Sequence, residues 1–157
     1  SMISGLGTAS FIVDTMQRMQ FSPVLVPAFL FLFGAFVSFA TGSSWGTFAI
    51  MMPLAIPMAH AFSIPYAIAA GAVLSGGLFG DHCSPISDTT ILSSTGAECE
   101  LVEHVKTQLP YAVVNGVIAF ACYILVGFTY SPLVVLLAVA LQAAVILAWN
   151  RMDVKKV

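Results

Sequence analysis

The sequence predicts an all-α integral membrane protein, and three observations support this fold class. Of its 157 residues, 59% are hydrophobic and 8% are charged, whereas soluble domains are usually about one quarter charged. Most apolar residues lie in stretches of helical length, although Pro and Gly interrupt several of them. A strongly polar run, GDHCSPISDTTILSS at 80–94, directly follows one of these stretches. A core of this size cannot bury so much apolar surface, so we expect the lipid bilayer to surround the chain.

The first expected element is a re-entrant helical hairpin over residues 24–62. Two apolar arms, 24–40 and 48–62, flank the small polar segment TGSSWGT at 41–47. At 1.5 Å per residue the arms reach about 25 and 22 Å, which is short of the roughly 30 Å hydrocarbon layer. The alternative is two ordinary spans joined by a loop outside the membrane.

The second expected element is a transmembrane helix over 64–95 that is broken in its middle. An apolar half-helix at 64–79 ends at glycines where the polar run begins, and Pro85 prevents a continuous helix. Residues 86–95 can resume the helix. Unwound backbone at membrane depth is tolerated only where protein or an aqueous cavity covers it.

The remaining chain predicts three helices, and we expect residues 1–157 to form one transmembrane domain. In residues 97–109 the apolar side chains fall on one face of a helix and the charged side chains on the other. This pattern predicts an amphipathic helix at the membrane interface. Two spans follow at 110–130 and 132–149. The tail after Trp149 holds three of the five basic residues, which predicts an inner-membrane protein with a cytoplasmic C-terminus.

The polar run requires a functional explanation. An ionisable group at the bilayer centre costs roughly 2.5–3.5 kcal/mol on insertion scales, and this run contains two aspartates. A cation site would explain them, because Na⁺ is a hard ion that prefers oxygen ligands. Carboxylate, hydroxyl and imidazole groups of the hairpin tip and the helix break are the candidates for ion or substrate binding: Thr41, Ser43, Ser44, Thr47, Asp81, His82, Ser84, Ser87, Asp88, Thr89 and Thr90.

Asp88 is the first choice for a titrating ligand, with Ser87 and Thr89 beside it as Na⁺ ligands, and Asp81 is the second. Desolvation raises the pKa of a carboxyl group and a bound cation lowers it, so H⁺ and Na⁺ can compete for one aspartate. This competition is the minimal requirement of an antiporter. Either aspartate could instead cap a helix, and His82 could relay protons or simply form a local hydrogen bond.

Other classes of function fit less well. Phe79-Gly80-Asp81 partly matches the motif of intramembrane aspartyl proteases, but Leu78 replaces its first glycine and no Tyr-Asp pair occurs. We therefore expect no enzyme. The His and Cys spacings match no usual zinc pattern, so no cofactor is expected beyond transported Na⁺ and H⁺. The net charge of −2, with no basic stripe, argues against nucleic acid as a partner. A structural membrane subunit, with the polar run as an exposed loop, is the remaining alternative.

Two strings carry a resemblance to a known family. ATGSSWGTFAIMMPLAIPMA at 40–59 and GAVLSGGLFGDHCSPISDTTILSS at 71–94 resemble the C-terminal half of the NhaC family of Na⁺/H⁺ antiporters, and the similarity extends over roughly 24–125. The resemblance implies one repeat of an inverted-repeat transporter, with 24–62 as its hairpin and 64–95 as its broken helix. It implies Na⁺/H⁺ exchange, or alternatively Na⁺-coupled transport of an organic anion or amino acid, as in malate/lactate exchange.

The length of the chain departs from this family. Its members are several hundred residues long, whereas this chain holds roughly one repeat. An inverted-repeat site needs both halves. We therefore expect the missing N-terminal half or a second chain as a partner, and a homodimer as the assembly.

Overall fold

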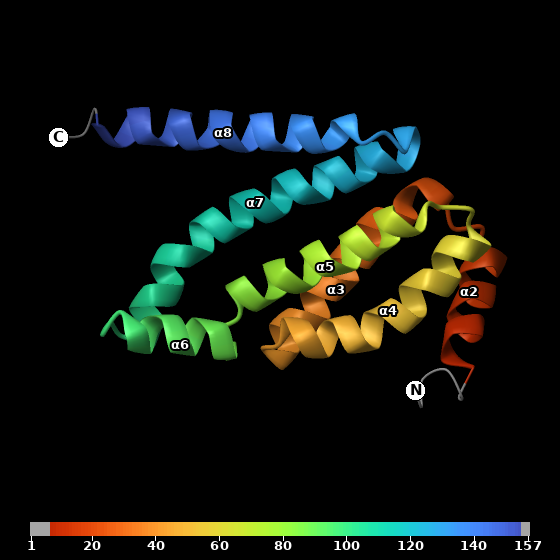
Figure 1. The fold of residues 1–157 in the computed structure, drawn as a ribbon, viewed down its shortest axis with the longest axis horizontal. Coiled ribbons are helices and arrows are strands. Elements are labelled where there is room, and N and C mark those ends of the chain that lie inside the picture. The colour runs from red at the N-terminus through yellow and green to blue at the C-terminus, as the bar shows by residue number, and fades with distance from the viewer. Residues whose placement is uncertain (1–6, 155–157) are drawn as a thin grey trace.

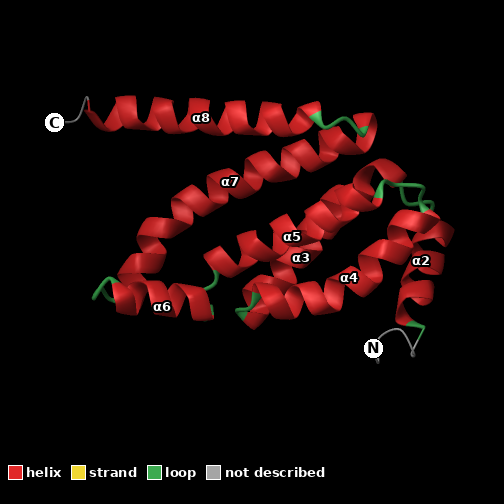
Figure 2. Cartoon of the chain, viewed as in Figure 1, coloured by secondary structure: helices red, strands yellow, loops and turns green. Residues whose placement is uncertain are grey.

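The computed structural model describes residues 7–154, and within them every regular element is a helix (Figure 2). The predicted all-α class is therefore confirmed. In chain order the elements are α2 (Thr8–Arg18), the short 3₁₀ helix η1 (Pro23–Leu25), α3 (Val26–Thr41), α4 (Ser44–Ala61), α5 (Tyr66–Cys83), α6 (Asp88–Gly96), α7 (Leu101–Thr129) and α8 (Leu133–Val154).

Helices α3, α4 and α5 form the centre of the molecule (Figure 1). Their facing apolar side chains build the core, which includes Leu30, Phe31, Met51, Met58 and Val73. Helix α2 packs on α4, while α7 crosses α3 and α5 on another side. Of the described elements, α8 packs only against α7, and most of its apolar side chains are exposed. Such a surface is expected where lipid or further protein segments lie alongside a helix.

Helices α3 and α5 run in the same direction and their backbones touch. A Cβ atom added to Gly76 would collide with the carbonyl of Phe31, and one added to Gly80 would collide with the carbonyl of Ala35. Small residues at such positions let two membrane helices approach closely. The glycines that we expected to end the first half-helix therefore lie inside α5 and serve its packing against α3.

The turn between α3 and α4 is shorter than the predicted tip. Gly42 ends α3 with a φ of 68°, which is the left-handed conformation favoured by glycine. Ser43 then caps α4, because its hydroxyl accepts a hydrogen bond from the Gly46 N–H at 3.3 Å. Ser44 to Thr47 consequently form the first turn of α4 instead of a loop.

The predicted interruption of the 64–95 segment lies at residues 84–87, between α5 and α6. Ser84 is already extended, with φ −81° and ψ 125°, as expected for a residue that precedes proline. Ser87 then caps α6 by accepting a hydrogen bond from the Thr90 N–H at 3.4 Å. Helix α6 restarts two residues later than the predicted Ile86.

The boundary expected at Pro110 is not a helix end. Helix α7 continues from Leu101 to Thr129 with Pro110 inside it, so residues 97–109 and 110–130 do not form separate helices. The first part of α7 runs at an angle to the remainder (Figure 1). This bend has a physical reason, because proline removes one backbone hydrogen bond and bends a helix without necessarily ending it.

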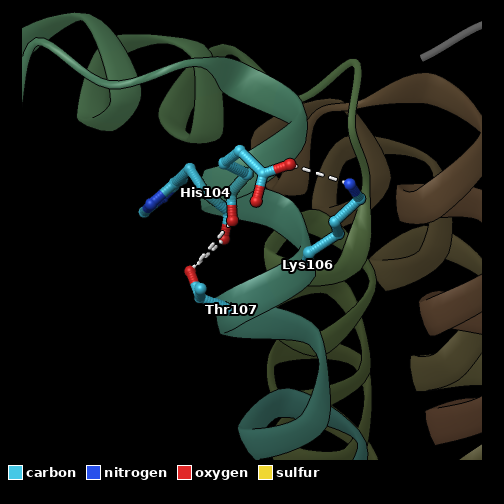
Figure 3. Close-up of polar contacts among 4 residues, drawn as sticks. His104, Lys106 and Thr107 are labelled. Carbon is cyan, nitrogen blue, oxygen red and sulfur yellow. Dashed lines mark hydrogen bonds and ion pairs between the residues drawn. The ribbon is translucent and has the colours of Figure 1, made fainter.

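The start of α7 is polar and exposed. Lys106 donates a hydrogen bond to Glu103 at 2.8 Å, and the Thr107 hydroxyl donates to the carbonyl of His104 at 2.8 Å (Figure 3). The stretches Pro23–Thr41 and Leu101–Thr129 are long and apolar enough to cross a membrane, and Leu133–Trp149 is a shorter apolar helix. The interfacial position of residues 97–109 stays a prediction.

Candidate ion-binding site

Asp81 is a buried carboxylate that joins α5 to the beginning of α6. Its side chain is 1% exposed. The Ser87 hydroxyl donates a hydrogen bond to Oδ1 at 2.9 Å, and the Thr89 hydroxyl donates to Oδ2 at 2.9 Å. These two hydroxyls also lie 2.8 Å from each other. The three side chains therefore form one hydrogen-bonded cluster across the break between the helices.

The environment of Asp81 leaves it room to bind a cation or a proton. A carboxylate offers about four acceptor positions, and the two hydroxyls occupy only part of them. Among the side chains that the structure describes, those of residues 7–149, the ion pair of Lys106 with Glu103 is the one salt bridge, so no Lys or Arg in that range neutralises Asp81. A buried charge is normally paired or coordinated. The carboxylate is therefore a suitable ligand for an ion that is not part of the chain.

Asp88 lies outside this cluster. Its side chain is exposed, and Oδ1 accepts a hydrogen bond from the Thr89 N–H at 2.8 Å. This local contact at the start of α6 corresponds to the capping alternative. The geometry thus favours Asp81 over Asp88, which reverses the ranking drawn from the sequence.

The end of the α3–α4 hairpin meets the break between α5 and α6. The Ser84 hydroxyl donates to the carbonyl of Phe39 at 2.8 Å. A Cβ added to Gly42 would lie 2.6 Å from the carbonyl oxygen of Ile86, so the backbones of turn and break are in contact. The two interrupted segments that the sequence singled out are therefore neighbours in space.

We expect Ser84→Ala to weaken this junction. The substitution removes one buried hydrogen bond between the break and α3, and such a bond contributes about 0.5–1.5 kcal/mol. Thermal unfolding of the purified protein in detergent would measure the loss as a lower melting temperature. Ser93→Ala, at an exposed position of α6, is the matched control and should melt like the wild type. Equal melting of both variants would contradict a stabilising role for Ser84.

The hydroxyl groups of the α3–α4 hairpin differ in burial and in their hydrogen-bond partners. Thr47 is buried and donates to the carbonyl of Ser43 at 2.9 Å, whereas Thr41 is exposed and donates to Val37 of its own helix at 2.9 Å. Ser44 is buried on the first turn of α4. Helices α4 and α5 are antiparallel, and Gly77 lies against Phe48. One turn further along each helix from this contact are Ser44 on α4 and Asp81 on α5.

The other predicted site residues of the break also include both exposed and buried side chains. His82 is exposed, and its Nδ1–H donates to the carbonyl of Leu78 at 2.7 Å, which corresponds to the local hydrogen bond expected as one alternative. The carbonyl of His82 accepts from Gln108 of α7 at 2.9 Å. Thr90 is buried, and its hydroxyl lacks a hydrogen-bond partner in the described part of the chain.

The sequence analysis missed Ser38. This residue of α3 is fully buried, and its hydroxyl has no hydrogen-bond partner among the described side chains, those of residues 7–149. A signal was available, because Ser38 is the one polar side chain in the apolar arm 24–40. It also lies one turn before the hairpin end.

Comparisons with known proteins indicate the family of the chain. The model of the Na⁺/H⁺ antiporter family matches residues 1–128. A protein of Haemophilus influenzae described only as uncharacterized is 51% identical over 82% of the chain. The malate-2H⁺/Na⁺-lactate antiporter of Bacillus subtilis is 38% identical over 60% of the chain. The Na⁺/H⁺ antiporter NhaC of Alkalihalophilus pseudofirmus is 36% identical over 58%. No solved structure matches.

The chain is short beside these relatives. It covers 24% of the length of the Haemophilus protein and 20% of each of the other two. Two of the three are named as antiporters, which agrees with the expectation of a transporter and not an enzyme. The family match covers more than half of the chain and includes both the hairpin and the helix break. The chain therefore belongs to the Na⁺/H⁺ antiporter family.

Proposed function

We propose that this chain carries an ion-binding site of a Na⁺/H⁺ antiporter, and that Asp81 is the group for which the two cations compete. The observation that carries the proposal is the buried Asp81 carboxylate, which accepts hydrogen bonds from the hydroxyls of Ser87 and Thr89 at a break between two helices. Transporters build ion sites at such breaks, where hydroxyls and freed carbonyls coordinate Na⁺.

The energetics of Asp81 support such competition. A charge at membrane depth costs roughly 2.5–3.5 kcal/mol. The N-terminus of α6, which begins beside this carboxylate, offsets typically 0.3–1 kcal/mol of that cost. The hydroxyls of Ser87 and Thr89 stabilise the charge further, and a bound Na⁺ or a bound proton would neutralise it. Protonation removes the charge that attracts Na⁺, so uptake of one cation releases the other.

The candidate ligands differ in their suitability. Ser87 and Thr89 already touch the carboxylate, and Ser44, Thr47, Ser84 and Thr90 are buried in the same region of the hairpin and the break. Asp88, His82, Thr41 and Ser43 are accessible or bonded locally, and we assign them to the rim of the site or to capping.

The assembly belongs to the same proposal. We propose that 24–62 is a re-entrant hairpin and that the chain represents one of two inverted repeats. The partner would be an N-terminal half or a second copy of the chain in a homodimer, within an inner membrane and with the C-terminus in the cytoplasm. Movement of one repeat against the other would then give alternating access.

Transport of ²²Na⁺ into proteoliposomes under an imposed pH gradient tests the proposed activity. The chain is reconstituted alone and together with the remaining transporter segments. We expect Na⁺ uptake that depends on the pH gradient when the site has both repeats. Uptake that is independent of the pH gradient, or absent from the complete assembly, would contradict Na⁺/H⁺ exchange.

A second candidate is Na⁺-coupled exchange of an organic anion. The observation that favours it is the 38% identity to the malate-2H⁺/Na⁺-lactate antiporter. The same proteoliposomes, loaded with malate and supplied with lactate outside, distinguish the two. A Na⁺ flux that requires these anions would replace simple Na⁺/H⁺ exchange as the function.

A further inference from the structure

Ser38 has an unusual position for a serine inside a helix. Its side chain is 0% exposed, and its hydroxyl has no hydrogen-bond partner in the described residues. Serine and threonine in helices usually donate to a carbonyl one turn earlier, as Thr41 of the same helix does to Val37 at 2.9 Å. A buried hydroxyl without a partner is unfavourable, so its retention in an apolar helix requires an explanation.

The register of α3 against α5 brings Ser38 to the level of Asp81. A Cβ on Gly34 would lie 3.5 Å from the Val73 carbonyl oxygen and 3.6 Å from the Gly77 nitrogen, so Gly34 is level with Gly77. The two helices are parallel, and one turn further along each of them are Ser38 and Asp81. Burial on this contact face leaves the Ser38 hydroxyl in the protein interior at the level of the carboxylate.

We propose that the Ser38 hydroxyl is a further ligand of the transported Na⁺. This inference rests on the proposed function and adds a residue to its site. Ser87 and Thr89 approach Asp81 from the start of α6, whereas Ser38 comes from α3. Both lone pairs of its oxygen are free of donors in the described structure, so they are available to a hard cation. The ion thereby supplies the partner that the hydroxyl lacks.

This role predicts an effect on affinity more than on rate. Without the Ser38 oxygen, the site still has the Asp81 carboxylate that exchanges H⁺ for Na⁺. We therefore expect the Km for Na⁺ of Ser38→Ala to rise about tenfold, as for one lost contact to a charged group. The maximal rate at saturating Na⁺ should stay close to that of the wild type. A residue that only supports the fold would lower the maximal rate and the protein yield together.

The experiment measures Na⁺-dependent proton movement in membrane vesicles that contain the complete transporter. Ser38→Cys accompanies Ser38→Ala, because the slightly larger thiol leaves no cavity but is a poor ligand for Na⁺. We expect a raised Km for Na⁺ in both variants. Ser75→Ala is the matched control, since Ser75 is half-buried on α5 and bonded to Tyr123 at 2.8 Å, away from Asp81. Its Km should be unchanged.

The results separate this inference from the function on which it rests. A wild-type Km in both Ser38 variants, beside normal exchange by the wild-type protein, would overturn the role of Ser38 alone. Absence of Na⁺-dependent exchange in the wild type would overturn the proposed function as well. If Ser38→Ala folds poorly, Ser38→Cys provides the test. Its melting temperature is measured with and without Na⁺, because a bound ligand stabilises the folded state. An undiminished Na⁺ effect in that variant also contradicts the proposal.

Discussion

Asp81→Asn is expected to abolish Na⁺-dependent proton movement, whereas Asp88→Asn is expected to retain most of it. The amide of Asn keeps the size of Asp81, and its one oxygen can still accept one of the two hydrogen bonds that Ser87 and Thr89 donate to the carboxylate. It cannot bind or release a proton in the same way, and it carries no charge to attract Na⁺. Asp88 is exposed and makes only a local contact with the Thr89 N–H, so its charge is not needed for a buried site. Dequenching of a pH-sensitive dye in everted vesicles on addition of Na⁺ measures both variants.

Equal amounts of folded protein in the membrane are the necessary control for this comparison. Size-exclusion profiles of both Asn variants in detergent should resemble that of the wild type. Normal exchange by Asp81→Asn together with loss of exchange in Asp88→Asn would contradict the assignment and favour Asp88. Normal exchange by both single variants would show that neither carboxylate is required for exchange.

Gly80→Ala is expected to separate α3 from α5 and to destabilise the whole domain. The added methyl group would collide with the carbonyl of Ala35, a backbone atom that cannot rotate away as a side chain could. Overpacking of this kind usually costs about 1–3 kcal/mol, and the upper part of that range is expected when both partners are backbone. The next residue is Asp81, so the displacement should also weaken Na⁺ binding. Melting temperature in detergent and the Km for Na⁺ measure the two effects.

Gly71→Ala is the control within the same helix. Its new Cβ would lie 3.6 Å from the hydroxyl of Tyr123, which is an ordinary contact distance. The helix propensity of Ala exceeds that of Gly, so this variant should be as stable as the wild type or slightly more stable. Destabilisation of equal size in both variants would show that loss of glycine itself, and not the close contact with α3, is responsible.

The sequence was sufficient for the elements and for the location of the polar cluster. The composition predicted helices, and the TGSSWGT and DHCSPISDTT segments marked the turn and the break that meet through Ser84 and Gly42. These features are local, because capping serines, Gly42 and Pro85 act on the residues next to them.

The sequence analysis placed Asp88 before Asp81 and did not select Ser38. Asp81 and Asp88 stand in the same polar run, and only the packing of α5 against α3 and α4 makes one buried and the other exposed. The roles of Gly76 and Gly80 likewise depend on α3, which is distant in sequence. Pro110 was predicted to end a helix, but α7 continues through it, because a proline can bend a helix without ending it.

The touching backbones of α3 and α5 also limit how the protein can move. The carbonyls of Phe31 and Ala35 are seated against Gly76 and Gly80, so neither helix can slide along the other without first lifting away from it. The pair is therefore expected to behave as one rigid body that keeps Ser38 and Asp81 at the same level throughout a cycle. Bending would be confined to the short turn at Gly42 and to residues 84–87. The cation would then stay bound between α3 and α5 throughout the cycle. The parts of the protein that close the site would move from one side of the membrane to the other.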